Sequence, residues 1–588
     1  MTRKAGLMIS PMRPAAQKRA ATGGMSGFFA SLCAFAICLT TLPVHGQINS
    51  LSNPATLERA LEDPKLPEAR TTKPLSLPES SIAPQGADEI RFTLESLSIR
   101  GGTLFDVGTI LALDAPQTGQ EISLSDIYDY ADTITQHYRQ AGYALSFALI
   151  PAQEITNGLV QLEIIEGRID ELVIRETNLS DLARRHILTA FDQFAQKGIT
   201  KTHDLENFLI AINGYPGITA KGVISPGAKQ GSSALILNVM QRTQSATLGY
   251  QNYLSESLGR DVFLADIALL GQWTGRDEAK ISVRQAPDKK AYHSVAFDYS
   301  SYVDDTALEV YFRASESKTR PKKGALADLD FNSSAYSQQI GAKLPLWQRR
   351  KSSLFVGGSV NVNDSASRNG TTPSTTDKTR SVTLYADYES DLKGGASQLF
   401  HVEIEQGAKF FHARANGRQG ANLHHTILRA SERYRQPLKQ LENGQVDATL
   451  RLFAQATLSE NPTFANAECA FGGRGFGIGM DAGTLSGEHC LLVSAQVNWQ
   501  RPFIDLPFLP SSVFTFFGRL DMGAVRQQGT LVAGEERQQE AISAAIGGQF
   551  VMTNGMTVNI EQATQLKNED SPALEGESKT NIAVNMPF

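Results

Sequence analysis

The chain has 588 residues, of which 41% are hydrophobic, and its 55 Lys and Arg residues are outnumbered by 61 Asp and Glu residues, for a formal charge of −6. This length allows several domains and a large hydrophobic core, and the acidic balance argues against a protein that binds nucleic acid by neutralising phosphates. A polytopic helical membrane protein is excluded too, because each span needs about 20 mostly apolar residues and only the N-terminal region comes near that length.

The apolar stretch at 27–44 follows a basic region and ends at a proline, which is typical of a secretory signal peptide. We expect cleavage before Gln47, so that residues 1–46 form the signal peptide. A retained membrane anchor is the alternative, and Ser31 and Thr40 within the short apolar run argue against it.

Two cysteines, Cys469 and Cys490, remain after this segment is removed. Because an exported chain enters an oxidising compartment, this pair could close a disulfide across a loop of moderate length. Two buried free thiols are the alternative.

Residues 47–90 are rich in Pro and Ser and contain one short helical pattern, formed by Ala55, Leu57 and Leu61 and stopped by Pro64. We interpret this segment as a short helix followed by a flexible linker.

Residues 91–243 predict two small α+β modules, at 91–167 and 168–243, because helical apolar faces are followed by alternating strands. The expected elements are a strand at 92–99, a helix from near Ser125 to Gly142, strands at 145–149 and 160–164, helices at 179–194 and 204–213, and a last strand at 235–239. A sheet of this size has an edge to which an extended peptide can add as a further strand, unless a neighbouring segment covers it.

From residue 244 to residue 588 the pattern changes to repeated strands in which apolar and polar residues alternate. The clearest examples are 295–299, 382–388, 450–456 and 491–499. The apolar face would point into the core of a soluble sandwich, or at lipid in an outer-membrane barrel. Alternation up to the terminal Phe588 favours the barrel, because it is expected for the closing strand of a bacterial barrel. At roughly 21 or 22 residues per strand and loop, the segment predicts about 16 antiparallel strands.

With a signal peptide, a short helix, two modules and a barrel in this order, the sequence resembles the two-partner secretion transporters, the family of hemolysin activators and filamentous hemagglutinin transporters. The resemblance covers nearly all of the mature chain and implies that the modules are polypeptide-transport-associated (POTRA) modules. The residues that carry it there are Tyr138, Gly142, Tyr143, Pro151, Gln153, Glu166, Gly167, Pro216 and Gly217. It implies that these modules bind the secretion signal of an unfolded partner in the periplasm.

A glycine-rich stretch at 471–481 carries the second part of the resemblance. Members of the family have an Arg-Gly-aromatic tripeptide here, on a long loop folded back into the barrel, and its arginine meets an aspartate of a wall strand. The wall motif resembles Phe517-Gly518-Arg519-Leu520-Asp521-Met522-Gly523, so the resemblance implies a latch onto Asp521 flanked by Gly518 and Gly523.

Two registers of the loop motif compete. Arg474-Gly475-Phe476 matches the tripeptide by identity, whereas spacing from the neighbouring glycines places it at Ile478-Gly479-Met480. We prefer the spacing, under which Ile478 replaces the arginine and the latch is weakened, or Arg474 supplies the charge from nearby. We therefore expect a contact between Arg474 and Asp521.

The sequence offers no catalytic, cofactor-binding or metal-binding constellation, and we expect no enzyme activity. The glycines at 477 and 479 imitate a dinucleotide fingerprint, but no βαβ context surrounds them. His424 and His425 form the one adjacent histidine pair and lack the spacing of metal ligands, which favours a place on the barrel rim or in the lumen.

The function that the resemblance implies is export of a secreted exoprotein through the outer membrane. Its expected partners are an exoprotein with an N-terminal secretion domain, outer-membrane lipid, and the barrel-assembly machinery that inserts the protein; nucleic acid is not among them. An outer-membrane assembly or insertion factor of the same superfamily is the alternative, although such factors usually carry more modules. A passive porin or receptor is a third reading, which the periplasmic modules argue against.

Overall fold

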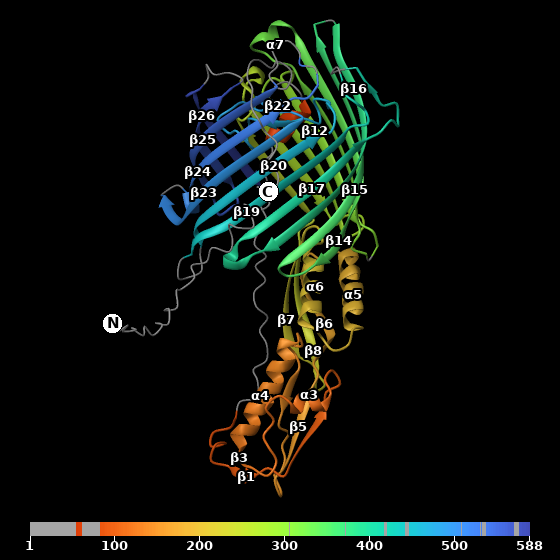
Figure 1. Ribbon diagram of the computed structural model, residues 1–588, viewed down its shortest axis with the longest axis vertical. Coiled ribbons are helices and arrows are strands. Elements are labelled where there is room, and N and C mark those ends of the chain that lie inside the picture. The colour runs from red at the N-terminus through yellow and green to blue at the C-terminus, as the bar shows by residue number, and fades with distance from the viewer. Residues whose placement is uncertain are drawn as a thin grey trace, which may run out of the picture. The chain divides into compact units, whose positions relative to one another are not determined.

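A computed structural model provides the structure of the chain (Figure 1). The described residues are 54–61, 83–304, 306–370, 372–416, 420–440, 446–506, 509–529, 531, 537–569 and 575–588. The predicted signal peptide at 1–46 lies outside them. The short helix expected near residue 55 is confirmed as α2 (Pro54–Leu61).

The first module contains β1 (Arg91–Thr93), β2 (Ser96–Gly101), α3 (Val107–Leu111), β3 (Glu121–Ser123), α4 (Leu124–Gln140), β4 (Phe147–Leu149) and β5 (Leu159–Ile165). Strand β1 pairs with β3, and β2, β5 and β4 form a second sheet in that order. Helix α4 begins where sequence patterning expects it, because Ser123 and Asp126 form a capping box. The helix ends before Gly142, whose φ of 92° suits glycine.

Sequence patterning misses two features of this module. The single strand expected at 92–99 is two strands that belong to different sheets, with Leu94 fully buried between them. Helix α3 was not expected because its five residues are too few to show a helical period; the side chain of Asp106 caps it by accepting from the Thr109 amide.

The second module contains β6 (Arg168–Thr177), α5 (Asp181–Ala195), α6 (Thr202–Asn213), β7 (Ile218–Pro226) and β8 (Ser232–Gln241). Its sheet has the order β6-β8-β7, and both helices pack on it through a core that includes Ile187, Phe208 and Leu235. The two helices and the last strand lie where the sequence predicts them.

The C-terminal half is a closed antiparallel barrel of 16 strands (Figure 1). The strands are β9 (Gln244–Gln251), β10 (Val262–Leu270), β11 (Asp277–Gln285), β12 (Tyr292–Tyr302), β13 (Glu309–Thr319), β14 (Phe331–Gln348), β15 (Ser352–Asn369), β16 (Thr372–Asp391), β17 (Ser397–Gly407), β19 (Thr426–Gln440), β20 (Val446–Ser459), β23 (His489–Leu506), β24 (Leu509–Arg526), β25 (Gln538–Val551), β26 (Thr557–Asn568) and β27 (Ser578–Pro587). The loops add α7 (Ala325–Asp328), the 3₁₀ turns η2 (Glu256–Leu258) and η3 (Lys393–Gly395), and the short strands β18 (Arg414–Ala415), β21 (Cys469–Phe471) and β22 (Leu485–Gly487). The predicted fold class is confirmed.

The last strand closes the barrel against the first. Strand β27 pairs antiparallel with β9, for example Ala583 with Gln251. The pairing continues to the end of the chain, because the amide of Phe588 donates to the carbonyl of Ala246 at 2.8 Å and the Ala246 amide donates back to the Phe588 carbonyl. Phe588 therefore lies at the seam, and closure leaves the barrel wall without an unpaired strand edge.

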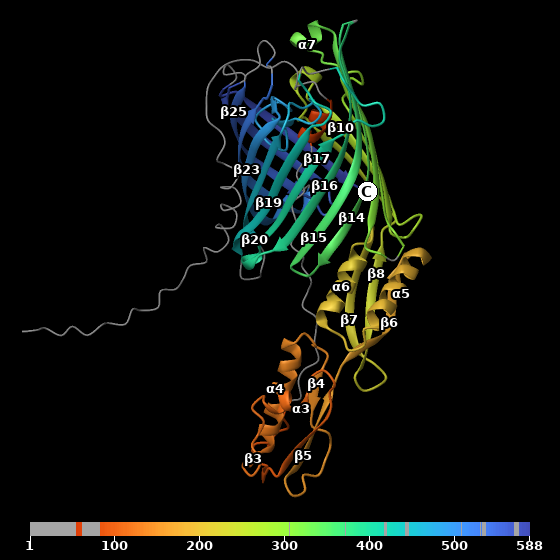
Figure 2. The same cartoon turned by 45° about the vertical axis from the view of Figure 1, so that its right-hand side comes forward.

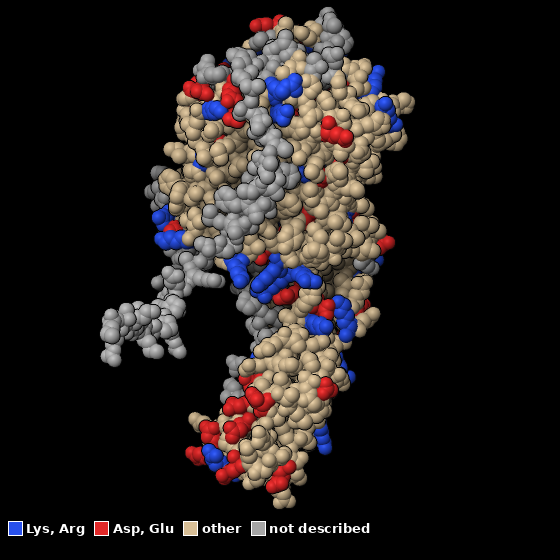
Figure 3. Space-filling view, in the orientation of Figure 1, with Lys and Arg blue, Asp and Glu red and all other residues tan. Residues whose placement is uncertain are grey.

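The outer surface of the barrel is apolar. Large hydrophobic side chains stand exposed along it, such as Ile340 at 62%, Leu384 at 61% and Ile546 at 71% exposure. On the face shown in Figure 3, charged side chains are sparse across the middle of the barrel and gather toward its two ends. This arrangement is the one expected for a wall that contacts hydrocarbon rather than a second protein layer.

Among the residues that the structure describes, no helix is long and apolar enough to cross a membrane.

Candidate functional site

The long loop between β20 and β23 is the candidate functional site. Its small hairpin of β21 and β22 is antiparallel, with Cys469 paired with Gly487. A disulfide joins Cys469 to Cys490, whose Cα atoms lie 6.4 Å apart. The tip of the loop is packed inside the barrel, since Phe471, Ile478 and Met480 are at most 2% exposed.

Asp521 on β24 is the centre of the contacts between this loop and the wall. Its carboxylate is completely buried and accepts from the main-chain amide of Ile478 at 2.9 Å. Its other oxygen accepts from Nε of Arg519, on the same strand, at 2.8 Å. Arg519 also donates to two loop carbonyls, those of Arg474 at 3.0 Å and Gly475 at 2.7 Å. Arginine and carboxylate thus form one polar unit that contacts the loop main chain.

Arg519 contacts Asp521 in this way, and the contact between Arg474 and Asp521 that sequence analysis expects stays a prediction. The guanidinium of Arg474 donates to the Gln251 side chain at 3.3 Å and lies 5.5 Å from the ring centroid of Tyr253. Two residues apart on one strand, Arg519 and Asp521 point to the same face, which is a signal that the wall motif contained and that sequence analysis did not use.

The remaining residues of the two loop registers are packed against the wall. The ring of Phe476 stacks on Phe453, with centroids 4.4 Å apart. A Cβ atom at Gly479 would lie 2.7 Å from the carbonyl oxygen of Thr564, so only glycine lets the loop approach β26 this closely. The carbonyl of Met480 accepts from Lys579 at 2.6 Å.

The two predicted wall glycines differ. A Cβ atom at Gly523 would lie 2.3 Å from the ring of Phe471, so this glycine makes room for the loop hairpin. A Cβ atom at Gly518 would have nothing within 4 Å. The structure therefore gives a packing role to Gly523 and none to Gly518.

Helix α2 is held by the barrel and by the same loop (Figures 1 and 2). Glu58 forms an ion pair with Arg284 on β11 at 3.3 Å and accepts from the hydroxyl of Ser294 on β12 at 2.9 Å. Arg59 donates to the carbonyl of Glu468, next to the disulfide, at 3.0 Å. Leu57 belongs to an apolar cluster that also contains Ile478 of the loop. The helix and the loop therefore share one packed centre.

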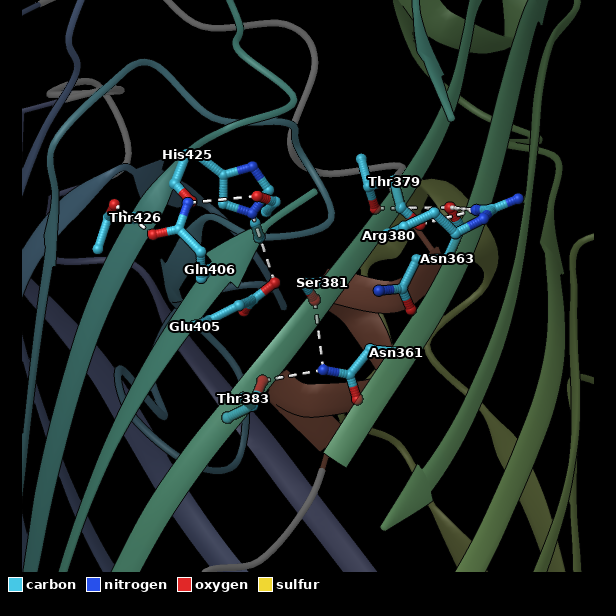
Figure 4. A network of polar contacts seen from close by, with 12 residues as sticks. Asn361, Asn363, Thr379, Arg380, Ser381, Thr383, Glu405, Gln406, His425 and Thr426 are labelled. Carbon is cyan, nitrogen blue, oxygen red and sulfur yellow. Dashed lines mark hydrogen bonds and ion pairs between the residues drawn. The ribbon is translucent and has the colours of Figure 1, made fainter. Parts of the chain in front are cut away.

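The wall around these elements is lined by polar side chains that bond from strand to strand. In Figure 4, Asn361 on β15 donates to Ser381 and Thr383 on β16. Further along the wall, Arg429 on β19 binds both Glu403 and Glu405 on β17 at 2.7 Å.

The histidine pair lies beside this charged group. His425, just before β19, is 1% exposed and lies 3.5 Å from Glu405 (Figure 4). The neighbouring His424 uses its main-chain amide to donate to the side chain of Asn422. Among the described residues, no group of three or more His, Cys, Asp and Glu side chains is arranged to hold a metal ion.

The motif residues of the first module cluster around Glu166. Its carboxylate accepts from the Thr103 amide and hydroxyl, both at 2.6 Å, and from the Leu104 amide at 2.8 Å. The buried hydroxyl of Tyr138 donates to it at 3.2 Å. Burial opposes ionisation, but these hydrogen bonds outweigh it and lower the pKa of Glu166. Glu166 thus fastens the loop after β2 to helix α4.

The other motif residues shape turns and joints. Tyr143 packs edge-on against Tyr138, and the Gly142 carbonyl accepts from Thr202 at the start of α6. Gln153 bonds the main chain of Gln161 in both directions and also donates to the Pro151 carbonyl. A Cβ atom at Gly167 would lie 2.3 Å from the Leu145 carbonyl. Pro216 and Gly217, the latter with φ of 76°, form the turn between α6 and β7.

Comparison with known proteins shows what this chain is similar to. The POTRA domain of the ShlB type matches residues 92–167. The heme/hemopexin transporter protein HuxB of Haemophilus influenzae (strain 86-028NP) is 27% identical over 267 residues, which cover 44% of this chain and 46% of HuxB. The outer membrane transporter CdiB of Escherichia coli is 24% identical over 187 residues, covering 32% of this chain and 31% of CdiB. The solved structure of CdiB from Escherichia coli has the same fold, with a TM-score of 0.67 at 16% identity over 91% of this chain and 95% of that chain.

A ShlB-type POTRA domain and a CdiB-like fold are thus the features that this chain shares with two-partner secretion transporters. Its barrel lies in the outer membrane and its ShlB-type POTRA domain in the periplasm. The matched stretch spans less than half of the length of the curated relatives named above.

Proposed function

We propose that this chain is a two-partner secretion transporter, which moves an unfolded exoprotein across the outer membrane. The observation that carries the proposal is that the barrel encloses two elements, helix α2 and the folded-in loop, each held to its wall by polar contacts as well as by apolar packing. Glu58 and Arg59 bind the helix, and Asp521 with Arg519 binds the loop. A lumen occupied by separately attached elements has a closed resting state and gives way to an open one when they move.

In the first step, the modules at 91–167 and 168–243 capture the cargo in the periplasm. The sheet orders leave β2 and β4 at the edges of one module and β6 and β7 at the edges of the other. An extended segment can add to such an edge through main-chain hydrogen bonds, which suits an unfolded cargo. The cargo class that fits is a secreted exoprotein with an N-terminal secretion domain.

In the second step, the cargo passes through the barrel at 244–588. The lumen wall carries hydroxyl, amide and charged side chains, such as Asn361, Thr383 and Arg429, that can exchange hydrogen bonds with a moving main chain. Folding of the cargo outside the cell provides the direction, and the chain acts as a transporter rather than an enzyme. Its other partners are outer-membrane lipid and the machinery that inserts its barrel.

Export of a co-expressed partner exoprotein tests the proposal. We expect the partner in the medium with the full-length chain, and its retention in the periplasm when residues 91–243 are deleted and the barrel is still inserted. Heat-modifiable migration of the barrel in gels controls for insertion.

Depletion of the protein separates this function from outer-membrane assembly. Under the proposal, only the partner exoprotein is lost from the surface and medium. A general loss of folded outer-membrane proteins with normal export of the partner would instead identify an assembly or insertion factor.

A further inference from the structure

Ile478 occupies the position that sequence spacing assigns to the loop arginine. Its side chain packs among apolar residues. It is 2% exposed and belongs to the cluster that contains Leu57 and Leu61 of α2. A guanidinium at this position would enter that apolar cluster, where a charge is costly. A cation that joins the loop to the wall must therefore lie at another position than 478.

Arg519 is that cation, because it joins the wall carboxylate to the loop. Its side chain is 9% exposed and donates to Asp521, to the Arg474 carbonyl and to the Gly475 carbonyl. The planar guanidinium has donors on two edges, so it can bind the carboxylate and both carbonyls at once, which an ammonium group cannot do.

We infer that Arg519 is the positioning residue that locks the folded-in loop to the barrel wall, and that it acts through the loop main chain. The loop contributes two carbonyls to Arg519, and the amide of Ile478 to Asp521. The contacts that Arg519 makes therefore depend on the path of the loop main chain at 474 and 475.

The lock on the loop also stabilises α2. Ile478 is held from both sides, because its amide donates to Asp521 and its carbonyl accepts from Asn581 on β27 at 3.2 Å. Its side chain, once positioned, packs in the cluster that contains Leu57. Release of Arg519 thus removes a packing surface from the helix as well as freeing the loop. This inference rests on the proposed function, since a lock has a use only if something must pass.

The test is planar-bilayer recording of the purified full-length protein without any partner, so that failure of export does not affect the result. Arg519→Met should raise the fraction of time in high-conductance states at least about tenfold, because several hydrogen bonds of a charged group are lost. Arg519→Lys should give a smaller increase, because an ammonium can still meet Asp521. Arg474→Ala should have less effect than Arg519→Met, because it keeps the carbonyl that Arg519 binds.

Arg313→Met is the matched control. Arg313 is also a barrel-strand arginine that faces an aspartate across the strand pair, Asp298 at 3.5 Å, and no hydrogen bond or ion pair that the structure gives for it reaches the loop. Its removal should leave conductance unchanged. An increase with Arg474→Ala and none with Arg519→Met would overturn the inference, as would equal increases for Arg313→Met and Arg519→Met.

Hydrogen exchange keeps the inference testable if Arg519→Met fails to fold. In Arg519→Lys, amides at 472–482 should exchange faster while those of β24 and β25 exchange as in the wild type. Unchanged exchange at 472–482 would overturn the inference, and faster exchange confined to the loop supports it. No export of a partner by the wild-type chain would count against the proposed function, whereas unaltered conductance in Arg519→Met would count against the lock.

Discussion

The first POTRA module and the barrel lumen hold their helices in opposite ways. In the module, α4 packs on the sheet through a continuous apolar core, with Ile127, Ile134 and Tyr138 all fully buried. In the lumen, α2 presents two leucines to an apolar cluster, and polar contacts of Glu58 and Arg59 also hold it. Apolar packing over a large area resists separation, whereas a few polar contacts can be exchanged for contacts with water or cargo. This difference fits a module that keeps α4 in place and, under the proposed function, a lumen from which α2 can move.

Removing apolar volume from the module should have the largest effect. Ile134→Ala is expected to destabilise the module by about 2–5 kcal/mol, because it leaves a cavity between α4 and the sheet. Faster hydrogen exchange across 124–140 in the full-length protein would report the loss. Val107→Ala, at a residue 53% exposed, is the control and should change exchange by little. Equal effects of the two substitutions would remove the contrast between module and lumen.

Opening the disulfide should have the next largest effect, and it should be confined to the loop. The double variant Cys469→Ser with Cys490→Ser removes a link across 21 residues. A closed loop of this size is worth about 3 kcal/mol. We expect faster exchange at 472–487 with a barrel that still migrates as folded. Exchange that rises throughout the barrel would mean that the disulfide supports the wall rather than the loop.

Weakening the attachment of helix α2 to the wall should raise conductance while the barrel stays folded. Glu58→Gln replaces a charged acceptor by a neutral one at Arg284 and Ser294, which costs about 1–2 kcal/mol and corresponds to roughly a tenfold rise in open time. Single-channel recording measures it. Lys280→Met is the control, since Lys280 pairs with Asp266 of the neighbouring strand, away from the bonds that hold α2. No rise with Glu58→Gln would show that the apolar cluster alone retains the helix.

Lowering the pH should have the smallest of these effects, a loss of the hydrogen bonds to Glu166 in the first module. The pKa of Glu166 is lowered from 4.5, so its hydrogen bonds stabilise the module fully above that pH and are lost as the pH falls below it through the lowered pKa. The protection factors of the Thr103 and Leu104 amides should decrease over that range. In Glu166→Gln they should be lower at neutral pH and nearly independent of pH. A pH response that persists in the variant would assign the titration to another group.

Much of the fold follows from local patterns. The barrel strands, the closing strand and the long helices α4, α5 and α6 show a repeat of two or of 3.6 residues, which depends only on which face is buried. Helix α3 does not follow from a local pattern, because five residues are too few to show a helical period. The break between β1 and β2 does not either, because it depends on the burial of Leu94.

The site is harder to predict than the fold. The sequence pattern indicates the glycine-rich loop, the wall motif and the two cysteines, but the choice between Arg474 and Arg519 depends on the path of the loop. That path is set by positive φ at Gly472, Gly473 and Gly477 and by close packing at Gly479. The helical pattern likewise predicts α2 and carries no information on its partners, which come from distant strands.

The contacts of α2 have a consequence for the order of biogenesis. The helix precedes every barrel strand in the chain, yet Arg284, Ser294 and the Glu468 carbonyl come from segments that the polypeptide supplies much later. The apolar cluster that receives Leu57 also draws on both sides of the β9–β27 seam, through Tyr253 and Ala583. The binding site for the helix is therefore complete only after β9 and β27 have paired. Helix α2 can therefore make its full set of contacts only in a closed barrel, so the helix in this position indicates a completed wall.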